Sequence, residues 1–358
     1  MPGDIFNRVD FLMRNVRNRL MMLSDFIQKE RTSPRRMPWR YAPVMWLKGF
    51  TSDSFYICQL DRNDPANYLP DIKRFKTRLI NGDYSIVLNN KLLFDSVVES
   101  KARVPKTYAF INEGVISPFL GSSPVSSVDD LVSFLKDNEL LVVKPVRSGG
   151  GENVYILKFW GDGVLVNRQR KSIGEFKQFL RGLDSFIITE YARQGNYAEK
   201  IFPEVANTVR FLTMLDESGE PFIAFAVHKF GTRASFPVDN WRRGGITALV
   251  DLDNGMIGTP LSYFGSGVYK KMRVHPDTGS PIEGVEIPNW KERKKEILNL
   301  AKSLPYLKYV GWDVAVEDDG ITVIEGNNYT DVNLLQAHCP LLKDGRIRNF
   351  YVRHGIID

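Results

Sequence analysis

The chain has 358 residues, of which 43% are hydrophobic, 25% charged and 12% aromatic. This is the composition of a globular protein with a sizeable core, and it excludes disordered, collagen-like and fibrous chains. The length predicts two domains or one large composite domain, so a ligand cleft between lobes is expected. The two cysteines, Cys58 and Cys339, lie far apart and outside any CxxC spacing, which excludes a disulfide framework and a structural zinc site.

The net charge of +6 is concentrated at the N-terminus. Residues 1–50 carry 10 Lys and Arg against 4 Asp and Glu, and the rest of the chain carries 38 of each sign. Because the basic excess is confined to one end, we expect no nucleic-acid binding. No apolar stretch approaches the ~18–20 residues that span a bilayer, and no signal-peptide pattern is present. We therefore expect a cytoplasmic protein, with residues 1–40 available for peripheral contact with the inner membrane face.

The first predicted element is a basic amphipathic helix over residues 5–30. Apolar residues recur at steps of three and four with arginines between them, at Phe6, Val9, Met13, Val16, Leu20, Leu23 and Ile27. Thr32-Ser33-Pro34 ends the helix, and a basic, aromatic linker follows. Such a helix either packs its apolar stripe onto the body of the protein or contacts an anionic membrane or an acidic partner.

From about residue 75 the sequence alternates between strand and helix patterns. Short β-branched runs predict strands at 140–143, 154–157, 186–189, 209–215, 222–227, 246–250, 312–316 and 321–324. Amphipathic patterns predict helices at 90–101, 127–138, 172–182 and 289–303. Hairpin-like turns at 216–219, 253–255 and 318–320 join neighbouring strands. This arrangement predicts an α+β protein with antiparallel sheets rather than a regular βαβ winding.

Residues 140–157 combine a strand, a lysine and a run of glycines. Lys144 ends an apolar run, and three glycines follow Ser148 before the next strand begins. Consecutive glycines leave backbone N–H groups free to face an anion, and a nearby lysine supplies the countercharge. No GxxxxGK[ST] motif is present. The segment is either a phosphate-binding hairpin or a glycine-rich hairpin without a ligand.

A second group of polar residues lies between 311 and 328. Asp313 comes early on one predicted strand, Glu325 ends the next strand, and Asn327 follows two residues later. Because a tight turn joins the two strands, their pairing brings three oxygen ligands together. Such ligands suit Mg²⁺, which takes its remaining ligands from water and phosphate.

Two further segments place arginines beside apolar strands. Residues 207–210 begin a strand that carries Arg210, and an arginine among apolar neighbours needs an anionic partner. That partner is either a phosphate or carboxylate ligand or a structural carboxylate. A loop with Asn240 and Arg243 precedes a glycine pair and also predicts an anion-facing site.

Taken in this order, these segments resemble the ATP-grasp fold, and most closely its glutamate-ligase-like branch associated with cell-surface polysaccharide synthesis. The similarity runs from about Asn89 to Leu342. It implies two lobes whose antiparallel sheets grip ATP, preceded by a helical N-terminal segment. The expected divisions are an N-terminal segment at 1–75, a first lobe at 76–190 with a lid at about 105–189, and a second lobe at 191–358 with the metal and substrate sites.

The resemblance also implies roles for individual residues. Those implied in binding ATP are Lys91, Lys144, Ser148, Gly149, Gly150, Gly151, Asn153, Glu190, Tyr191 and Ala192. Those implied in binding two Mg²⁺ ions, with Mn²⁺ as a substitute, are Asp313, Glu325 and Asn327. Those implied in catalysis are Lys144, Arg210, Asn240 and Arg243, with Asn240 and Arg243 holding the acceptor carboxylate.

On this resemblance the chain is an ATP-dependent ligase that forms a C–N bond between a small-molecule carboxylate and an amine through an acyl phosphate. Its substrates would be sugar- or amino-acid-derived, in polysaccharide or related metabolite biosynthesis. One alternative keeps the fold and phosphorylates a hydroxyl or a phosphate. Another is a non-catalytic protein that recruits a membrane or a partner through the basic N-terminus. The segment 263–275 carries no motif that identifies a substrate.

Overall fold

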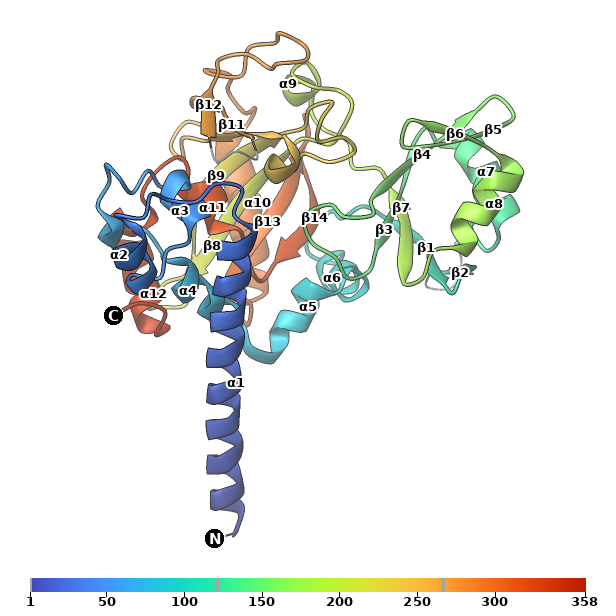
Figure 1. Cartoon of the computed structure of the whole chain (residues 1–358). Coiled ribbons are helices and arrows are strands. Elements are labelled where there is room, and N and C mark those ends of the chain that lie inside the picture. The colour runs from blue at the N-terminus through green and yellow to red at the C-terminus, as the bar shows by residue number, and fades with distance from the viewer. Residues whose placement is uncertain (1, 120–122, 265–267) are drawn as a thin grey trace.

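The protein is described by a computed structural model that covers residues 2–119, 123–264 and 268–358, without the side chains of residues 2–12, 14, 15, 264 and 268. Its strands form two seven-stranded sheets in separate lobes (Figure 1). Every strand pair within the described residues is antiparallel. The α+β class and the two-lobed, antiparallel architecture expected from the sequence are therefore confirmed.

The smaller lobe is built on a sheet with the strand order β2-β1-β7-β3-β4-β5-β6. In chain order its strands are β1 (Thr107–Asn112), β2 (Val115–Pro118), β3 (Leu141–Pro145), β4 (Tyr155–Trp160), β5 (Gly163–Val166), β6 (Gln169–Ser172) and β7 (Phe186–Glu190). The helices α7 (Val128–Asp137) and α8 (Ile173–Arg181) pack against β4, β5 and β6. Their apolar faces bury Leu131 and Phe176, so this lobe has a core of its own.

The larger lobe is built on a sheet with the strand order β12-β11-β10-β9-β8-β13-β14. In chain order its strands are β8 (Thr208–Leu215), β9 (Pro221–Phe230), β10 (Ile246–Leu249), β11 (Leu261–Phe264), β12 (Val268–Lys271), β13 (Tyr309–Val316) and β14 (Ile321–Asn327). The helix α10 (Trp290–Ser303) covers one face, while α11 (Val332–Gln336) and α12 (Gly345–Arg353) cover the other. β8 and β13 are buried along their whole lengths because both faces are covered.

Short helices before residue 100 complete the larger lobe. They are α2 (Ala42–Leu47), α3 (Ser52–Ile57), α4 (Asp71–Arg74), α5 (Ser85–Asn89) and α6 (Lys91–Val98), with α9 (Asn196–Glu199) between the lobes in sequence. Phe50, Phe55 and Leu69 share one buried apolar cluster with Tyr309 and Phe350. Much of the expected 1–75 segment is thus packed into the larger lobe.

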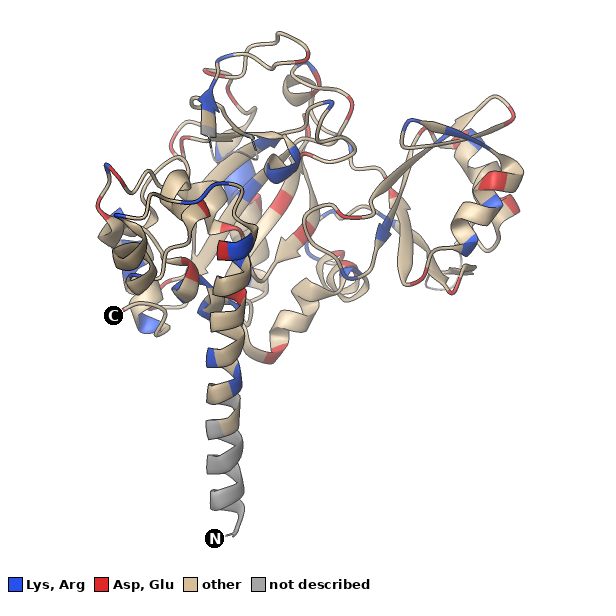
Figure 2. Ribbon diagram, viewed as in Figure 1, with Lys and Arg blue, Asp and Glu red and all other residues tan. Residues whose placement is uncertain are grey.

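The helix α1 (Pro2–Thr32) projects from the body of the protein (Figure 1), and basic residues lie along its described part (Figure 2). The apolar residues of its stripe are between 42% and 63% exposed at Met13, Val16, Leu20, Leu23 and Ile27. The side chains of Phe6 and Val9 lie outside the described ones. These five described side chains are therefore exposed to solvent over about half of their surface or more.

The last turns of α1 hold the helix to the body through polar contacts. Lys29 Nζ donates to the hydroxyl of Tyr329 at 2.9 Å, and the carboxylate of Glu30 accepts from the backbone N–H of Ser52 at 2.6 Å. Within the described part of the chain, no helix combines the length and the apolar character that crossing a bilayer requires.

The sequence-based expectations found eight of the strands and the main helices of the body, and missed six strands of four to six residues. Each of the eight predicted strand runs overlaps an observed strand, and the four predicted helices in the body correspond to α6, α7, α8 and α10. The strands β1, β2, β5, β6, β11 and β12 were not predicted. Residues 265–267 of the 263–275 segment lie outside the described residues.

Candidate active site

A cavity of about 530 Å³ lies where the two lobes meet. Its walls come from β3, β4 and β7 of the smaller lobe, from β8, β9, β13 and β14 of the larger lobe, and from the N-terminal segment. A pocket of this size accommodates a ligand as large as a nucleotide.

The floor of the cavity is a row of charged side chains across four adjacent strands of the larger sheet. Asp313 on β13 lies opposite Arg210 on β8 and opposite Glu325 on β14. Lys229 on β9 lies opposite Thr208, two residues from Arg210, so its side chain emerges on the same face. Strand register therefore gathers two cations and two carboxylates that are up to about a hundred residues apart in sequence.

Asp313 is clamped between the two cations. The Nε and Nη2 atoms of Arg210 donate to its two carboxylate oxygens at 2.7 and 2.6 Å, and Lys229 Nζ lies 2.9 Å from Oδ1. Burial alone would raise the pKa of Asp313, but attraction to Arg210 and then Lys229 outweighs it and holds the pKa well below its ordinary value. Lys229 also pairs with Asp239 at 3.2 Å. Asp313 is thus ionised at neutral pH.

Glu325 and Asn327 stand beside this clamp and offer oxygen ligands. The Nδ2 atom of Asn327 lies 3.3 Å from Glu325 Oε1 and 3.4 Å from Asp313 Oδ2, so the three side chains predicted as metal ligands lie together. Within the described residues, no three Asp, Glu, His or Cys side chains gather as a metal cluster. The carboxylate and amide oxygens of Asp313, Glu325 and Asn327 are the kind of ligand that Mg²⁺ accepts, and Mg²⁺ takes few protein ligands and completes its shell with water and phosphate oxygens.

Two lysines face this oxygen cluster from the other side of the cavity. Lys91 Nζ lies 3.9 Å from Glu325 Oε2 and 3.3 Å from the carbonyl oxygen of Ser148. Lys144, at the end of β3, is buried, and burial lowers its pKa against the opposing attraction of Asp95. Both lysines line the cavity beside the glycine run. A polyphosphate placed here would lie between lysine cations and the glycine run on one side and a metal-binding edge on the other.

The glycine run joins β3 to β4 of the smaller lobe and contacts the larger lobe. Gly150 and Gly151 have φ angles of +68° and +71°, which residues other than glycine rarely adopt. The Nδ2 atom of Asn240 donates to the carbonyl of Gly150 at 2.8 Å, and a Cβ on Gly151 would lie 2.6 Å from Val238. The run therefore touches the larger lobe, and at Gly151 a larger residue would clash with Val238.

Beside the two lysines and the glycine run, the cavity has an apolar slot. Val142, Val154, Ile156 and Ile324 line it, together with residues at and after the end of β7, namely Thr189, Glu190, Tyr191 and Ala192. A planar purine needs apolar contacts on its two faces and hydrogen bonds from the main chain along its edge. The aliphatic side chains of this slot and the backbone at the end of β7 suit both needs.

Most of the residues expected from the sequence meet in this cavity. Its lining includes Lys91, Lys144, Ser148, Gly149, Gly150, Gly151, Glu190, Tyr191, Ala192, Arg210, Asn240, Asp313, Glu325 and Asn327. Asn153 and Arg243 are not among the lining residues, and the side chain of Arg243 is exposed. The neighbouring Arg242 lines the cavity instead.

Sequence reasoning missed Lys229, Asp239, Asp331 and the cavity-lining residues before position 75. One signal was available for Lys229: like Arg210, it is a cation within an apolar strand run and so needs an anionic partner. Asp239, Asp331 and the N-terminal residues carry no such signal, because their partners become neighbours only through the tertiary fold.

The comparison with protein families agrees with this geometry. The model of the family described as sugar-transfer associated ATP-grasp matches residues 72–342. The chain belongs to this family, and its fold is the ATP-grasp fold. A comparison with curated proteins finds no match.

Solved structures with similar folds are distant in sequence. The ATP-grasp ligase PsnB complexed with minimal precursor has 12% identity and a TM-score of 0.41, over 77% of this chain and 63% of that chain. D-alanine–D-alanine ligase from Bacillus anthracis complexed with ATP has 15% identity and a TM-score of 0.36, over 75% and 68%. L-amino acid ligase from Bacillus licheniformis has 12% identity and a TM-score of 0.37, over 73% and 44%. The chain thus spans less than two thirds of the length of PsnB.

We predict that Asp313→Asn destabilises the protein by about 3–5 kcal/mol, because it leaves two buried cations without their shared anion. The free energy of unfolding in urea measures this. Glu325→Gln is the matched control, since Glu325 is more exposed and its nearest cation is 3.9 Å away, and it should change stability by less than about 1 kcal/mol. Equal effects of the two variants would contradict the clamp.

Proposed function

We propose that the chain is an ATP-dependent ligase that joins a carboxylate to an amine through an acyl phosphate. The observation that carries the proposal is the meeting, in one cavity, of lysines and a glycine run with an oxygen-ligand edge and the Arg210–Asp313 clamp. This set of groups can hold a nucleotide triphosphate and stabilise the charge that moves when its γ-phosphoryl group is transferred. A non-catalytic recruitment protein would have no need of it.

In the proposed reaction a carboxylate oxygen of the substrate attacks the γ-phosphorus of ATP and ADP leaves. The amine then attacks the carbonyl carbon, phosphate leaves, and the nitrogen loses a proton. Lys91 and Lys144 bind the phosphates, and the glycine run excludes water that would hydrolyse the acyl phosphate. Arg210 keeps Asp313 ionised and oriented, and it has further N–H groups for developing oxyanions. Bound at Asp313, Glu325 and Asn327, Mg²⁺ would neutralise phosphate charge.

The alternative within the same fold is a kinase that transfers the phosphoryl group to a hydroxyl or a phosphate. A ligase must protect an acyl phosphate until the amine arrives, so a closing loop and an arginine serve both half-reactions. A kinase needs them in only one step. The family's association with sugar transfer supports a role for the ligase in polysaccharide or related metabolite biosynthesis.

We further propose that α1 attaches the protein to an anionic membrane surface. The helix projects from the body, and an apolar stripe with arginines beside it is exposed to solvent. This combination is typical of helices that lie in a membrane interface. Because anionic lipids attract basic residues within a Debye length, attachment should weaken with salt.

We predict that Mg·ATP stabilises the protein by roughly 2.7 kcal/mol at a hundredfold excess over Kd, which raises the melting temperature. Thermal denaturation with and without Mg·ATP measures the effect. In Glu325→Gln combined with Asn327→Ala, the part of the shift that depends on Mg²⁺ should disappear. An unchanged shift in this variant would remove these residues from the site.

We predict that hydroxylamine traps a hydroxamate during ATP turnover with the correct carboxylate, and that ¹⁸O from this carboxylate appears in the released phosphate. Arg210→Lys should lower kcat by at least about tenfold, because lysine cannot hold both oxygens of Asp313, with less effect on ATP affinity. Formation of ADP together with a stable phosphate ester, and no ¹⁸O in free phosphate, would favour the kinase.

We predict that the intact chain co-sediments with vesicles containing anionic lipid and that deletion of residues 1–20 abolishes this without affecting ATP binding. The deletion stops before Asp25 because Lys29 and Thr32–Pro34 line the cavity. Binding should fall as salt is raised. If the intact chain instead binds no lipid and forms a dimer that dissociates when residues 1–20 are deleted, the apolar stripe pairs with a second copy of the chain.

A further inference from the structure

The end of the cavity farthest from the glycine run is walled by residues that precede the family match. Lys29, Thr32, Ser33, Pro34, Thr51, Asp53 and Asp71 all line it, and the match begins only at residue 72. The opposite wall consists of Arg242 and of residues that follow β14. This chain therefore builds one end of its cavity from an N-terminal segment that the family pattern does not include.

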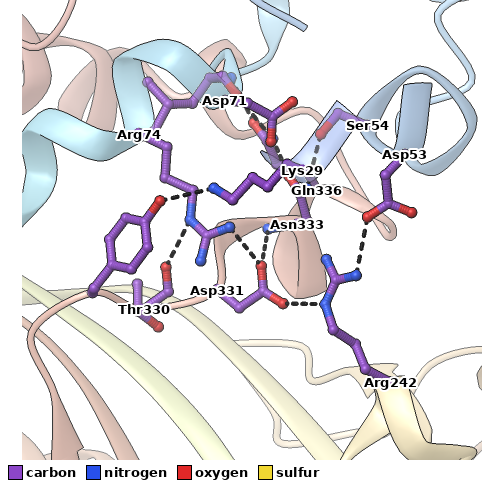
Figure 3. A network of polar contacts seen from close by, with 12 residues as sticks. Lys29, Asp53, Ser54, Asp71, Arg74, Arg242, Thr330, Asp331, Asn333 and Gln336 are labelled. Carbon is purple, nitrogen blue, oxygen red and sulfur yellow. Dashed lines mark hydrogen bonds and ion pairs between the residues drawn. The ribbon is translucent and has the colours of Figure 1, made fainter. Parts of the chain in front are cut away.

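The charged groups at this end form an alternating chain (Figure 3). Arg74 and Arg242 approach Asp331 from opposite sides, with Arg74 Nη1 3.1 Å from Oδ1 and Arg242 Nε 3.1 Å from Oδ2. Arg242 Nη1 continues to Asp53 Oδ2 at 3.0 Å. Lys29 is likewise paired with Asp25 at 2.9 Å. Because the charges are compensated in pairs, this end has little net charge to attract a strongly anionic or cationic ligand.

The same groups retain unused hydrogen-bonding capacity. Among the described residues, the Nη2 atoms of Arg74 and Arg242 and the Oδ1 atom of Asp71 have no hydrogen-bond or ion-pair partner. The side chain of Arg74 is only 8% exposed, yet it lines the cavity. Because these atoms belong to side chains that line the cavity, they are hydrogen-bonding groups that a ligand in the cavity can reach.

This network adjoins the point where the phosphoryl group would be transferred. The hydroxyl of Thr330 accepts a hydrogen bond from Arg210 Nη1 at 2.9 Å. The backbone carbonyl of Thr330 accepts one from Arg74 Nε at 3.3 Å. One residue therefore links the clamp at Asp313 to the far end of the cavity. A ligand at this end can present a reacting group toward Arg210 while its remainder contacts the network.

We propose that the far end of the cavity is a subsite for a sugar, and that residues 29–74 are part of the active site. A sugar is uncharged over most of its surface, and each hydroxyl both donates and accepts hydrogen bonds. It therefore matches guanidinium donors and carboxylate acceptors that are already neutralised by one another and held in position. This subsite depends on the proposed ligase function in one respect only, namely that the sugar is taken to be part of the substrate that reacts with the acyl phosphate.

Ligand binding to the full chain tests this subsite, by saturation-transfer NMR and calorimetry with Mg²⁺ and a non-hydrolysable ATP analogue. The probes are methyl glucoside, glucosamine and glucuronate as sugars, L-alanine and L-glutamate as amino acids, and glucose 6-phosphate as a strong anion. We expect saturable binding of at least one sugar. Arg242→Gln should weaken it about tenfold or more, because a hydrogen bond to a charged group is lost.

Matched measurements separate this loss from misfolding. Affinity for the ATP analogue, at the other end of the cavity, should persist in Arg242→Gln and in a second variant, Lys29→Gln, which also should weaken the sugar. Arg346→Gln, on an exposed arginine paired with Asp216 outside the cavity, should leave sugar binding unchanged.

Three results would overturn the subsite: amino acids or glucose 6-phosphate bind while the sugars do not, none of the probes binds, or sugar binding is the same in Arg242→Gln. Sugar binding is also measured without nucleotide. Failure to bind the ATP analogue would therefore reject the ligase proposal without deciding the sugar subsite.

Discussion

The site depends on one buried carboxylate shared by two buried cations. Asp313 alone would be expensive to bury, and so would Arg210 or Lys229, but together they satisfy most of one another's hydrogen bonds. The cluster also fixes what surrounds it. Lys229 and Thr208 hold Asp239, which leads into the loop that contacts the glycine run. Arg210 holds Thr330, which begins the far wall. Both ends of the cavity are therefore positioned from the same point on the central strands.

Contact between the lobes adds what the floor cannot supply. The two cations of the floor are already paired with Asp313, so a polyphosphate bound there needs cations from elsewhere. Lys91 comes from the start of α6, where the Asn90 side chain caps the helix, and Lys144 comes from the smaller lobe. The bond from Asn240 to Gly150 joins the lobes above this point. In the proposed reaction, phosphate binding and closure of the cavity would therefore involve the same short segment, and this would keep water from the acyl phosphate.

The sequence allowed prediction of those parts of the fold that depend on local pattern. Long apolar runs and amphipathic helices were found because their periodicity is visible in sequence, and Asp313, Glu325 and Lys144 were found because each stands at or near the end of such a run. The strands β5 and β6 were missed because they are short, and β6 is polar. Asp331 and Arg74 were missed for a different reason. Their pairing joins residues about 250 positions apart, and no local pattern encodes that distance.

The N-terminal segment is held to the rest of the protein by two different kinds of contact. The last two turns of α1 are held to the body by polar contacts of Asp25, Lys29 and Glu30, each worth about 1 kcal/mol. Beyond Thr32 the chain is fixed instead by apolar burial, since Met37, Phe50 and Phe55 belong to the same core cluster as Phe350. The cavity wall from Thr51 onward is thus anchored by the core, while Lys29 and Thr32 of the wall belong to the end of α1. Attachment through α1 can therefore change without disturbing the wall, provided that its last two turns are kept.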